Sequence, residues 1–159
     1  MADLRKEKTP MPEQEPSVRR HNWDEVASGY TEEMAVLEAG RCIQCKNPAC
    51  MSGCPVGVSI PAFIKKITEK KYTEAYDIIK GTNALPAVCG RVCPQERQCE
   101  SKCVRGRNGE SVGIGRLERF CADYADRVGY ETKSESVKKN GKRVAVVGSG
   151  PSSITCAVD

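Results

Sequence analysis

Cysteine spacing is the feature of this 159-residue chain that points most directly to chemistry. Eight of its ten cysteines form two compact runs: Cys42, Cys45, Cys50, Cys54 and then Cys89, Cys93, Cys99, Cys103. The first run reads C-x2-C-x4-C-x3-C and is followed by Pro55. Three thiolates so close in sequence can reach three corners of one iron–sulfur cube, while the fourth cysteine serves a second cluster, as in two-cluster ferredoxins. The spacing therefore predicts two 4Fe–4S clusters and a role in electron transfer.

The same reasoning divides the ligands between the two clusters. The first cluster is expected to use three cysteines of the first run and one that crosses back from the second, namely Cys42, Cys45, Cys50 and Cys103. The second cluster is expected to use Cys54, Cys93 and Cys99. One corner of the second cluster remains, and Cys89 is the chemical choice because thiolate is the softer and usual ligand of iron–sulfur iron.

Zinc and disulfides are the two alternatives for these cysteines. Structural zinc sites usually pair two C-x2-C knuckles or add histidine, but only Cys42 and Cys45 form such a knuckle and His21 is the only histidine. Disulfides need an oxidising compartment, and the charged segment from Met1 to Pro16 has no apolar signal region. We therefore expect a reduced, cytoplasmic chain, with iron–sulfur ligation favoured over both alternatives.

Composition indicates a small core that needs metal to hold it. The chain has two Phe, one Trp and five Tyr, so bound clusters would contribute folding free energy. The net charge is +4, and six cations that can offset cluster charge lie near the cysteines: Lys46, Arg91, Arg97, Lys102, Arg105 and Arg107. Nucleic acid is a disfavoured partner because no aromatic residues alternate with these cations. No apolar stretch is long enough for a membrane span.

Helical signals dominate residues 23–130. Residues 1–22 are polar and proline-rich, and are expected to form an extended arm that needs a partner to become ordered. Helices are expected after Thr31, after Ser59 and after Thr73 as N-caps, and from about residue 115 to 127. Residues 85–103 are expected to be short turns, and residues 105–115 a glycine-containing loop. The cysteine region is therefore expected to be all-α.

A different domain is expected to begin after a linker at residues 131–141. Residues 143–147 (Arg-Val-Ala-Val-Val) have the pattern of a buried β-strand, and a G-x-G-x-x-S version of the dinucleotide fingerprint follows, with Gly148, Gly150 and Ser153 as candidate cofactor-binding residues. One strand and half a helix do not make a Rossmann domain. We therefore expect residues 142–159 to be the truncated start of an FAD- or NAD(P)-binding domain in a longer flavoenzyme.

Four motifs together resemble one family. These are RCIQCKNPACMSGCPV from Arg41, VCGRVCPQE from Val88, IGRLERF from Ile114 and the GSGP that begins at Gly148. In this order they closely resemble the small (beta) subunit of NADPH-dependent glutamate synthase, over about residues 22–159. The large subunit of ferredoxin:NADP oxidoreductase and the N-terminal part of dihydropyrimidine dehydrogenase share the same module.

The resemblance implies an alpha-helical ferredoxin-like domain with two 4Fe–4S clusters, joined in the full-length protein to FAD- and NADPH-binding domains. Electrons would pass from NADPH to FAD and through the clusters to the flavin of a large (alpha) subunit that makes glutamate. The chain itself has no hydride site and no amidotransferase nucleophile, so it would be a non-catalytic part of an oxidoreductase. Two alternatives stay open: the same module feeding another acceptor, such as ferredoxin or a pyrimidine, and a metal-stapled interaction domain.

The resemblance also supplies a candidate for the eighth ligand. Similar proteins use a carboxylate or amide from the helix after the second run, and the matching residue here is Glu118. Without the resemblance, Glu118 would be an ordinary solvated charge paired with Arg116 or Arg119. With it, Glu118 is favoured, Cys89 becomes a buried thiol near the cluster, and Cys121 and Cys156 are non-ligands.

Overall fold

The computed structural model describes residues 3–132 and 140–158, and these residues contain helices but no β-sheet. The α-helices are α1 (Pro16–Arg19), α2 (Glu32–Ala39), α3 (Ala49–Ser52), α4 (Ile60–Thr68), α5 (Tyr72–Lys80), α6 (Pro86–Val92), α7 (Ile114–Arg127) and α8 (Pro151–Val158). Between α6 and α7 lie three 3-10 helices, η1 (Gln95–Arg97), η2 (Glu100–Lys102) and η3 (Val104–Arg107). The expected all-α class is confirmed. None of the described helices has the length and hydrophobicity needed to span a bilayer.

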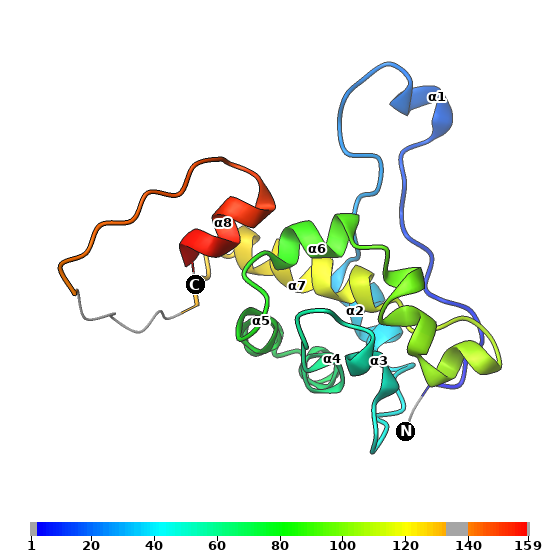
Figure 1. Cartoon of the computed structure of the whole chain (residues 1–159). Helices are drawn as coiled ribbons and strands as arrows, with labels where there is room; N and C mark the ends of the chain where they lie inside the picture. The colour runs from blue at the N-terminus through cyan, green and yellow to red at the C-terminus, as the bar shows by residue number, and fades with distance from the viewer. Residues whose placement is uncertain (1–2, 133–139, 159) are drawn as a thin grey trace.

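Helix α7 is the centre of the fold and packs against α6, α5 and α2 (Figure 1). Its apolar residues recur at three- and four-residue steps, so Leu117, Phe120 and Cys121 are all buried on one face. Helix α4 packs against α5 and α2, and buries Phe63 and Ile67 completely. The cysteine runs lie in short turns around this helical core, which therefore positions them.

Most of the predicted helices are present, with two differences. The Thr31 side chain accepts a hydrogen bond from the Met34 amide at 3.3 Å and caps α2, as predicted. The prediction that Thr73 caps α5 is wrong, because α5 begins at Tyr72, Lys71 stands at the N-cap position without a side-chain hydrogen bond, and Thr73 lies inside the first turn. Helix α6 stands where only turns were predicted, and Pro86 begins it, a position where the missing amide proton of proline costs nothing.

Residues 3–9 lie on the helical domain of the same chain. The Asp3 amide donates to the Gly40 carbonyl at 2.8 Å, and the Glu110 amide donates to the Lys6 carbonyl at 2.7 Å. Thr9 is buried, and its amide donates to the Glu38 carboxylate at 2.7 Å. This segment is thus ordered without the partner that its polar composition suggested, because its backbone groups bond to the domain. Within the N-terminal part of the chain, residues 10–28 project from the body (Figure 1).

The C-terminal segment has a helix but not the predicted strand. Residues 143–147 are extended without regular structure, because a strand needs a neighbouring strand for its backbone hydrogen bonds and the described residues provide none there. Gly148 follows with a φ of +123°, and a side chain at this position would meet the Ser153 hydroxyl. Helix α8 then begins at Pro151 and has no buried residue. Residues 133–139 of the predicted linker lie outside the described residues.

Candidate metal centres

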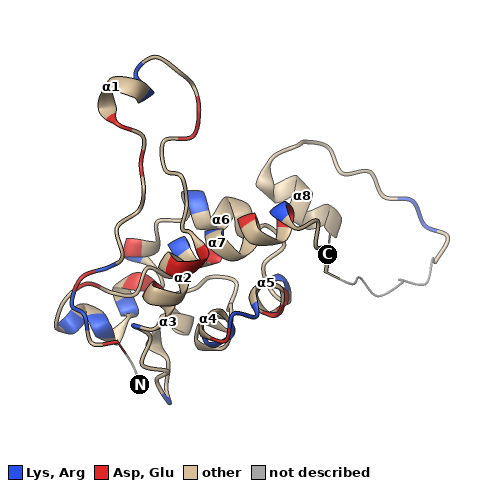
Figure 2. Cartoon of the chain, turned by 180° about the vertical axis from the view of Figure 1, so that it is seen from behind, with Lys and Arg blue, Asp and Glu red and all other residues tan. Residues whose placement is uncertain are grey.

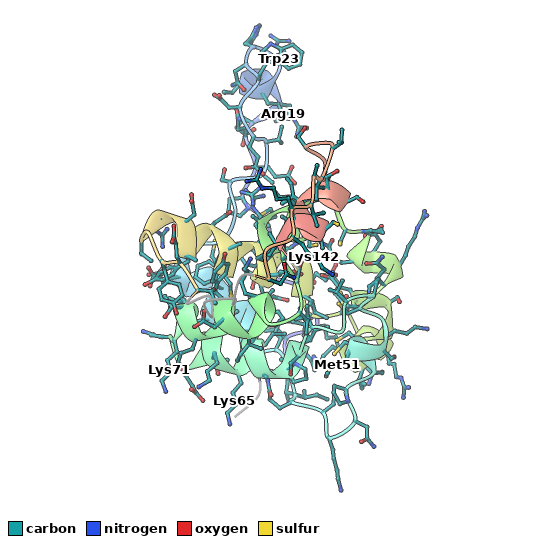
Figure 3. All side chains as sticks on the ribbon, turned by 60° about the vertical axis from the view of Figure 1, so that its left-hand side comes forward. Arg19, Trp23, Met51, Lys65, Lys71 and Lys142 are labelled. Atoms are coloured by element: carbon teal, nitrogen blue, oxygen red, sulfur yellow. The ribbon has the colours of Figure 1, made fainter. Side chains whose placement is uncertain are left out.

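Four cysteines predicted for the first cluster line one cavity: Cys42, Cys45, Cys50 and Cys103. Helix α2 ends just before Cys42, α3 carries Cys50, and Cys103 joins η2 to η3. The walls are apolar and include Ile60 and Ile64 of α4 and Ile114 of α7. Figure 3 shows this part of the molecule beside the labelled Met51 of α3. The structure thus brings Cys103 back to the first run, as its spacing predicted.

Burial and mutual repulsion act on these thiols. Burial is the main cause that raises the pKa of Cys50 to about 11, and the neighbouring Cys103 and Cys42 add to the effect. Burial likewise raises the pKa of Cys42 above the usual range. Without metal these thiols therefore keep their protons at neutral pH. Because metal binds thiolate, cluster assembly has to release these protons.

Cys54 does not line this cavity, and the packing of Gly53 explains why. A Cβ atom on Gly53 would lie 2.6 Å from the Gln98 carbonyl oxygen and 3.0 Å from Cys99 Cα, so only glycine allows the two backbones to come this close. The turn after α3 is therefore pressed against the segment that carries Cys99. Cys54, the next residue, is held beside the second cysteine run.

A second group forms around Cys93 and Cys99. Burial first, and then negative charge on Cys89, Glu118 and Cys54, raise the pKa of Cys93 to about 11. Burial first, and then negative charge on Glu100, Cys54 and Glu118, raise the pKa of Cys99 to about 12. Charges affect a pKa in this way only at short range. Cys54 and Glu118, both predicted for the second cluster, thus act on both thiols.

Glu118 is not the solvated, ion-paired residue that its sequence neighbours would suggest. Arg119 pairs with Asp123 and Glu25, and Arg116 donates to the Thr9 carbonyl. None of the salt bridges found among the described residues involves Glu118. Burial raises the pKa of Glu118 to about 7. A partly buried carboxyl group without a cation partner is a strong candidate for metal ligation.

Asn83 is a site residue that the sequence did not reveal. It is buried, and its side-chain amide donates to Glu118 Oε1 at 2.6 Å, which opposes the effect of burial on the pKa of Glu118. Its own Oδ1 accepts from the Leu85 amide at 3.0 Å, so the turn before α6 fixes the Asn83 side chain. An asparagine whose side chain bonds to the backbone two residues later is a recognisable signal of a turn in the sequence. Its contact with Glu118, 35 residues away, can be seen only in the folded structure.

The other cysteines have different surroundings. The Cys89 thiol lies 3.6 Å from Asn83 Oδ1, to which it can donate, and it also adjoins Cys93. It therefore stays at the edge of the second group and remains the alternative eighth ligand. Cys121 is fully buried in the core of α7, and burial raises its pKa far above the usual range. Cys156 is exposed on α8.

A buried ion pair holds in place the chain segment that leads to Cys42 in the first cavity. The side chains of Arg41 and Glu38 are both fully buried, and Arg41 Nη1 lies 2.6 Å from Glu38 Oε1. Arg41 also donates to the Glu110 carbonyl at 2.6 Å and the Ser111 carbonyl at 3.1 Å, while Glu38 accepts from the Gly113 amide at 2.8 Å. These bonds tie the end of α2 to the loop before α7. Cys42, next to Arg41, is therefore held in place.

The basic residues near the cysteines have separate roles. Lys102 and Arg105 line the first cavity, where their charge can offset that of a thiolate-bound cluster. Arg91, in contrast, pairs with Glu25 and Asp123, so its charge is already balanced. The predicted electrostatic role therefore applies to part of the basic set only.

The donor set fits two iron–sulfur clusters. It consists of seven thiols and one carboxyl, divided between two neighbourhoods, and soft thiolates are the usual ligands of such clusters. Within residues 3–132 and 140–158, no three Cys, His, Asp or Glu side chains converge as ligands of a single metal ion. The members of the first group are therefore related by the cavity that they line together, and those of the second by their effects on the pKa of Cys93 and Cys99.

Comparison with known proteins supports the same chemistry. The family described as dihydropyrimidine dehydrogenase domain II, 4Fe–4S cluster, matches residues 19–130. The chain is 39% identical to the glutamate synthase [NADPH] small chain of Escherichia coli K12 over 140 residues, which is 88% of this chain and 30% of that protein. The corresponding protein of Azospirillum brasilense is 36% identical over 149 residues, or 92% of this chain and 31% of that protein.

A second type of relative has nearly the same similarity. The NAD-dependent dihydropyrimidine dehydrogenase subunit PreT of E. coli K12 is 37% identical over 135 residues, which is 85% of this chain and 32% of that protein. The chain thus spans about a third of the length of the curated relatives it matches, and its resemblance to glutamate synthase small chains is confirmed. Because the family match includes both cysteine runs and Glu118, the chain belongs to the dihydropyrimidine dehydrogenase domain II, 4Fe–4S cluster family.

Proposed function

We propose that the chain binds two 4Fe–4S clusters and relays electrons within a larger oxidoreductase. The first cluster would be held by Cys42, Cys45, Cys50 and Cys103. The second would be held by Cys54, Cys93, Cys99 and Glu118. The observation that carries this proposal is the placement of Cys103 in the cavity of the first run, while Gly53, the residue before Cys54, is pressed against the backbone of Cys99.

The surrounding residues have defined tasks in such a relay. A 4Fe–4S cluster supplies one-electron chemistry when bound. Ile60 and Ile64 keep water away from the thiolates of the first group, and Lys102 offsets their charge. Asn83 holds one oxygen of Glu118, which orients the carboxylate for the second group. Each task lowers the cost of keeping charged groups inside a small core.

The larger enzyme would be a glutamate synthase. In this proposal residues 23–130 form the cluster domain, and residues 142–159 begin a dinucleotide-binding domain in which Gly148, Gly150 and Ser153 approach the cofactor. FAD and NADPH would bind in that domain of the full-length protein, and the acceptor would be the flavin of a large chain. The similarity of the chain to glutamate synthase [NADPH] small chains supports this assignment.

Iron analysis tests the two clusters. Anaerobic reconstitution should give about eight irons and eight sulfides per chain, with a visible absorbance that dithionite bleaches reversibly. A chain that holds one or two irons, or that folds equally well with zinc alone, would contradict the proposal.

A cysteine variant tests the relay. In an enzyme that joins this chain to flavin and NADPH domains, Cys50→Ser should leave dye reduction by NADPH intact and abolish electron transfer to the large chain. Cys156→Ser is the matched control, because Cys156 is exposed and far from both groups in sequence. Unchanged transfer in the Cys50 variant would show that electrons bypass the first group.

A different acceptor is the second candidate, favoured by the PreT relative, which is almost as similar as the glutamate synthase chains. Supplying either a glutamate synthase large chain or a dihydropyrimidine dehydrogenase catalytic subunit to the same enzyme distinguishes the two. Faster reoxidation by the second protein would assign the module to pyrimidine chemistry.

A further inference from the structure

Residues 10–28 form an ordered hairpin arm that stands away from the helical body (Figures 1 and 3). Its two sides are joined by hydrogen bonds from the Gln14 amide to the Val26 carbonyl and from the Ser28 amide to the Pro12 carbonyl, each 2.8 Å long. At its base, Arg91 of α6 pairs with Glu25 at 2.8 Å. The arm is therefore a defined structure and not a loose tail.

The tip of the arm exposes apolar side chains to solvent. Trp23, the single tryptophan of the chain, is fully exposed, and Val18 is 54% exposed. The backbone around them is nevertheless fixed, because the Asn22 side chain donates to Gln14 Oε1 at 2.9 Å and accepts from the Asp24 amide at 3.0 Å. Figure 3 shows Trp23 at the end of the arm, far from the labelled residues of the body.

The tip is also basic. Residues 16–23 contain two arginines, Arg19 and Arg20, and no acidic residue; Arg19 also forms a long, exposed ion pair of 3.7 Å with Glu13 of the same arm. The acidic residues of the arm lie lower, on its two sides (Figure 2). Tryptophan and arginine are the residues that most often dominate binding energy at protein interfaces, and a preorganised loop loses little entropy on binding. The tip is thus suited to an apolar pocket with carboxylates at its rim.

The chain itself contains such a pocket next to the base of the arm. We name it the α6/α7 groove; it has a volume of about 720 Å³ and apolar walls formed by Tyr76, Leu85, Val88, Val92, Ala122 and Tyr130. Its acidic residues are Asp123, Asp126 and Glu131. Val92 on α6 is 70% exposed, so part of this apolar surface has no cover. Arg91 lines the groove and also binds the arm, so groove and arm base are adjacent.

We propose that the hairpin arm of one copy of this chain docks in the α6/α7 groove of a second copy, and that the exchange is reciprocal. Trp23 would enter the apolar part of the groove, and Arg19 and Arg20 would face Asp126 and Glu131, because Asp123 already pairs with Arg91 and Arg119. The geometry suits a two-fold dimer, because two arms lying antiparallel place each tip at the base of the other arm, where the groove lies. Neither contact is possible within one chain, since the tip points away from its own groove.

Sedimentation of the reconstituted chain is the first test. Between about 1 and 100 µM the chain should shift from monomer to dimer, and added salt should weaken the dimer. Trp23→Ala should weaken it at least about 30-fold, as expected for a central anchor. Leu37→Ala is the matched control, because Leu37 is 49% exposed on α2, away from arm and groove. A monomer throughout, or equal dimerisation of both variants, would overturn the proposal.

Mixing two variants separates loss of contact from loss of structure. The double variant Asp126→Lys/Glu131→Lys should impair the groove and leave the arm intact. The Trp23→Ala variant should impair the arm and leave the groove intact. Neither variant should dimerise alone at a concentration where the native chain does, but an equimolar mixture should form a heterodimer through its one intact contact. Failure of the mixture, with both variants folded and carrying full iron, would contradict reciprocal exchange.

Labelling with 5-fluorotryptophan gives one fluorine resonance, from Trp23. This resonance should move with protein concentration as the dimer forms. The chemical shift of this resonance could instead stay at the value of a solvent-exposed tryptophan at all concentrations and change only when a glutamate synthase large chain is added. In that case the tip binds a different protein and the proposal is wrong.

Discussion

Gly90→Ala should separate α6 from α7 and damage the second cluster group. Gly90 lies in the middle of α6 where this helix crosses α7, and a Cβ atom there would be 2.6 Å from the Arg119 nitrogen and 2.7 Å from Arg119 Cα. These are backbone atoms of α7, which cannot swing aside as a side chain would. Because ordinary contacts are about 3.5–4.0 Å, the helices would have to move apart by roughly 1 Å.

The cost follows from this displacement. Overpacking by one methyl group costs about 1–3 kcal/mol, and alanine regains up to about 1 kcal/mol through its better helix propensity. The contact distances place Gly90 at the upper end of the range, so we expect a net loss of about 2 kcal/mol. For a domain of this size that loss lowers the melting temperature by about 4–8 °C.

The assay is thermal unfolding of the reconstituted chain together with its iron content. Cys93 directly follows α6 and Glu118 precedes Arg119 on α7, so the variant should also lose iron from the second group and fall from about eight irons toward four. Gly106→Ala is the control, because its nearest neighbour would be 3.8 Å from the new Cβ. If both variants melt and bind iron alike, the close crossing of α6 and α7 is wrong.

Three further predictions concern the buried charges and the metal. Arg41→Met should destabilise the chain by about 3–5 kcal/mol, because it leaves the Glu38 carboxylate buried without a partner; chemical denaturation measures this, and a loss under about 1 kcal/mol would contradict it. Glu118→Ala should lose or alter the electron paramagnetic resonance signal of one cluster while Cys89→Ala keeps both, and the reverse result would make Cys89 the eighth ligand. Removal of iron by a chelator under reducing conditions should lower the melting temperature by more than 10 °C, on the order of the free energy that structural metal supplies, whereas an unchanged transition would show that the core is sufficient alone.

Local signals in the sequence were enough for much of the helical framework. Thr31 caps α2 through a bond three residues away, and the apolar steps of α7 need only its own residues. Spacing also predicted that Cys103 lies near the first cysteine run, because three closely spaced cysteines bind three corners of one cluster and the fourth ligand has to come from another segment. These features depend on short stretches of chain, which is why they could be predicted.

The features that escaped prediction depend on distant partners. The sequence of α6 has no apolar period and contains Gly90, yet it forms a helix because Gly90 allows close contact with Arg119 of α7. Residues 3–9 look like a disordered tail but bond to the loop at Glu110. The reverse error occurred at residues 143–147, where an apolar run predicted a strand, but the part of the chain that the structure describes offers no neighbouring strand for it to pair with.

The surroundings of Glu118 link metal binding to the packing of α6 against α7. A carboxylate inside a protein is costly unless a cation lies next to it, and the hydrogen bond from Asn83 offsets only part of that cost. The nearby arginine Arg119 is committed to Asp123, so the positive charge has to come from elsewhere. Iron bound by Cys93 and Cys99 would supply it. In the metal-free chain the same carboxyl group opposes the packing that holds it, so we expect this end of the domain to loosen first when iron is lost.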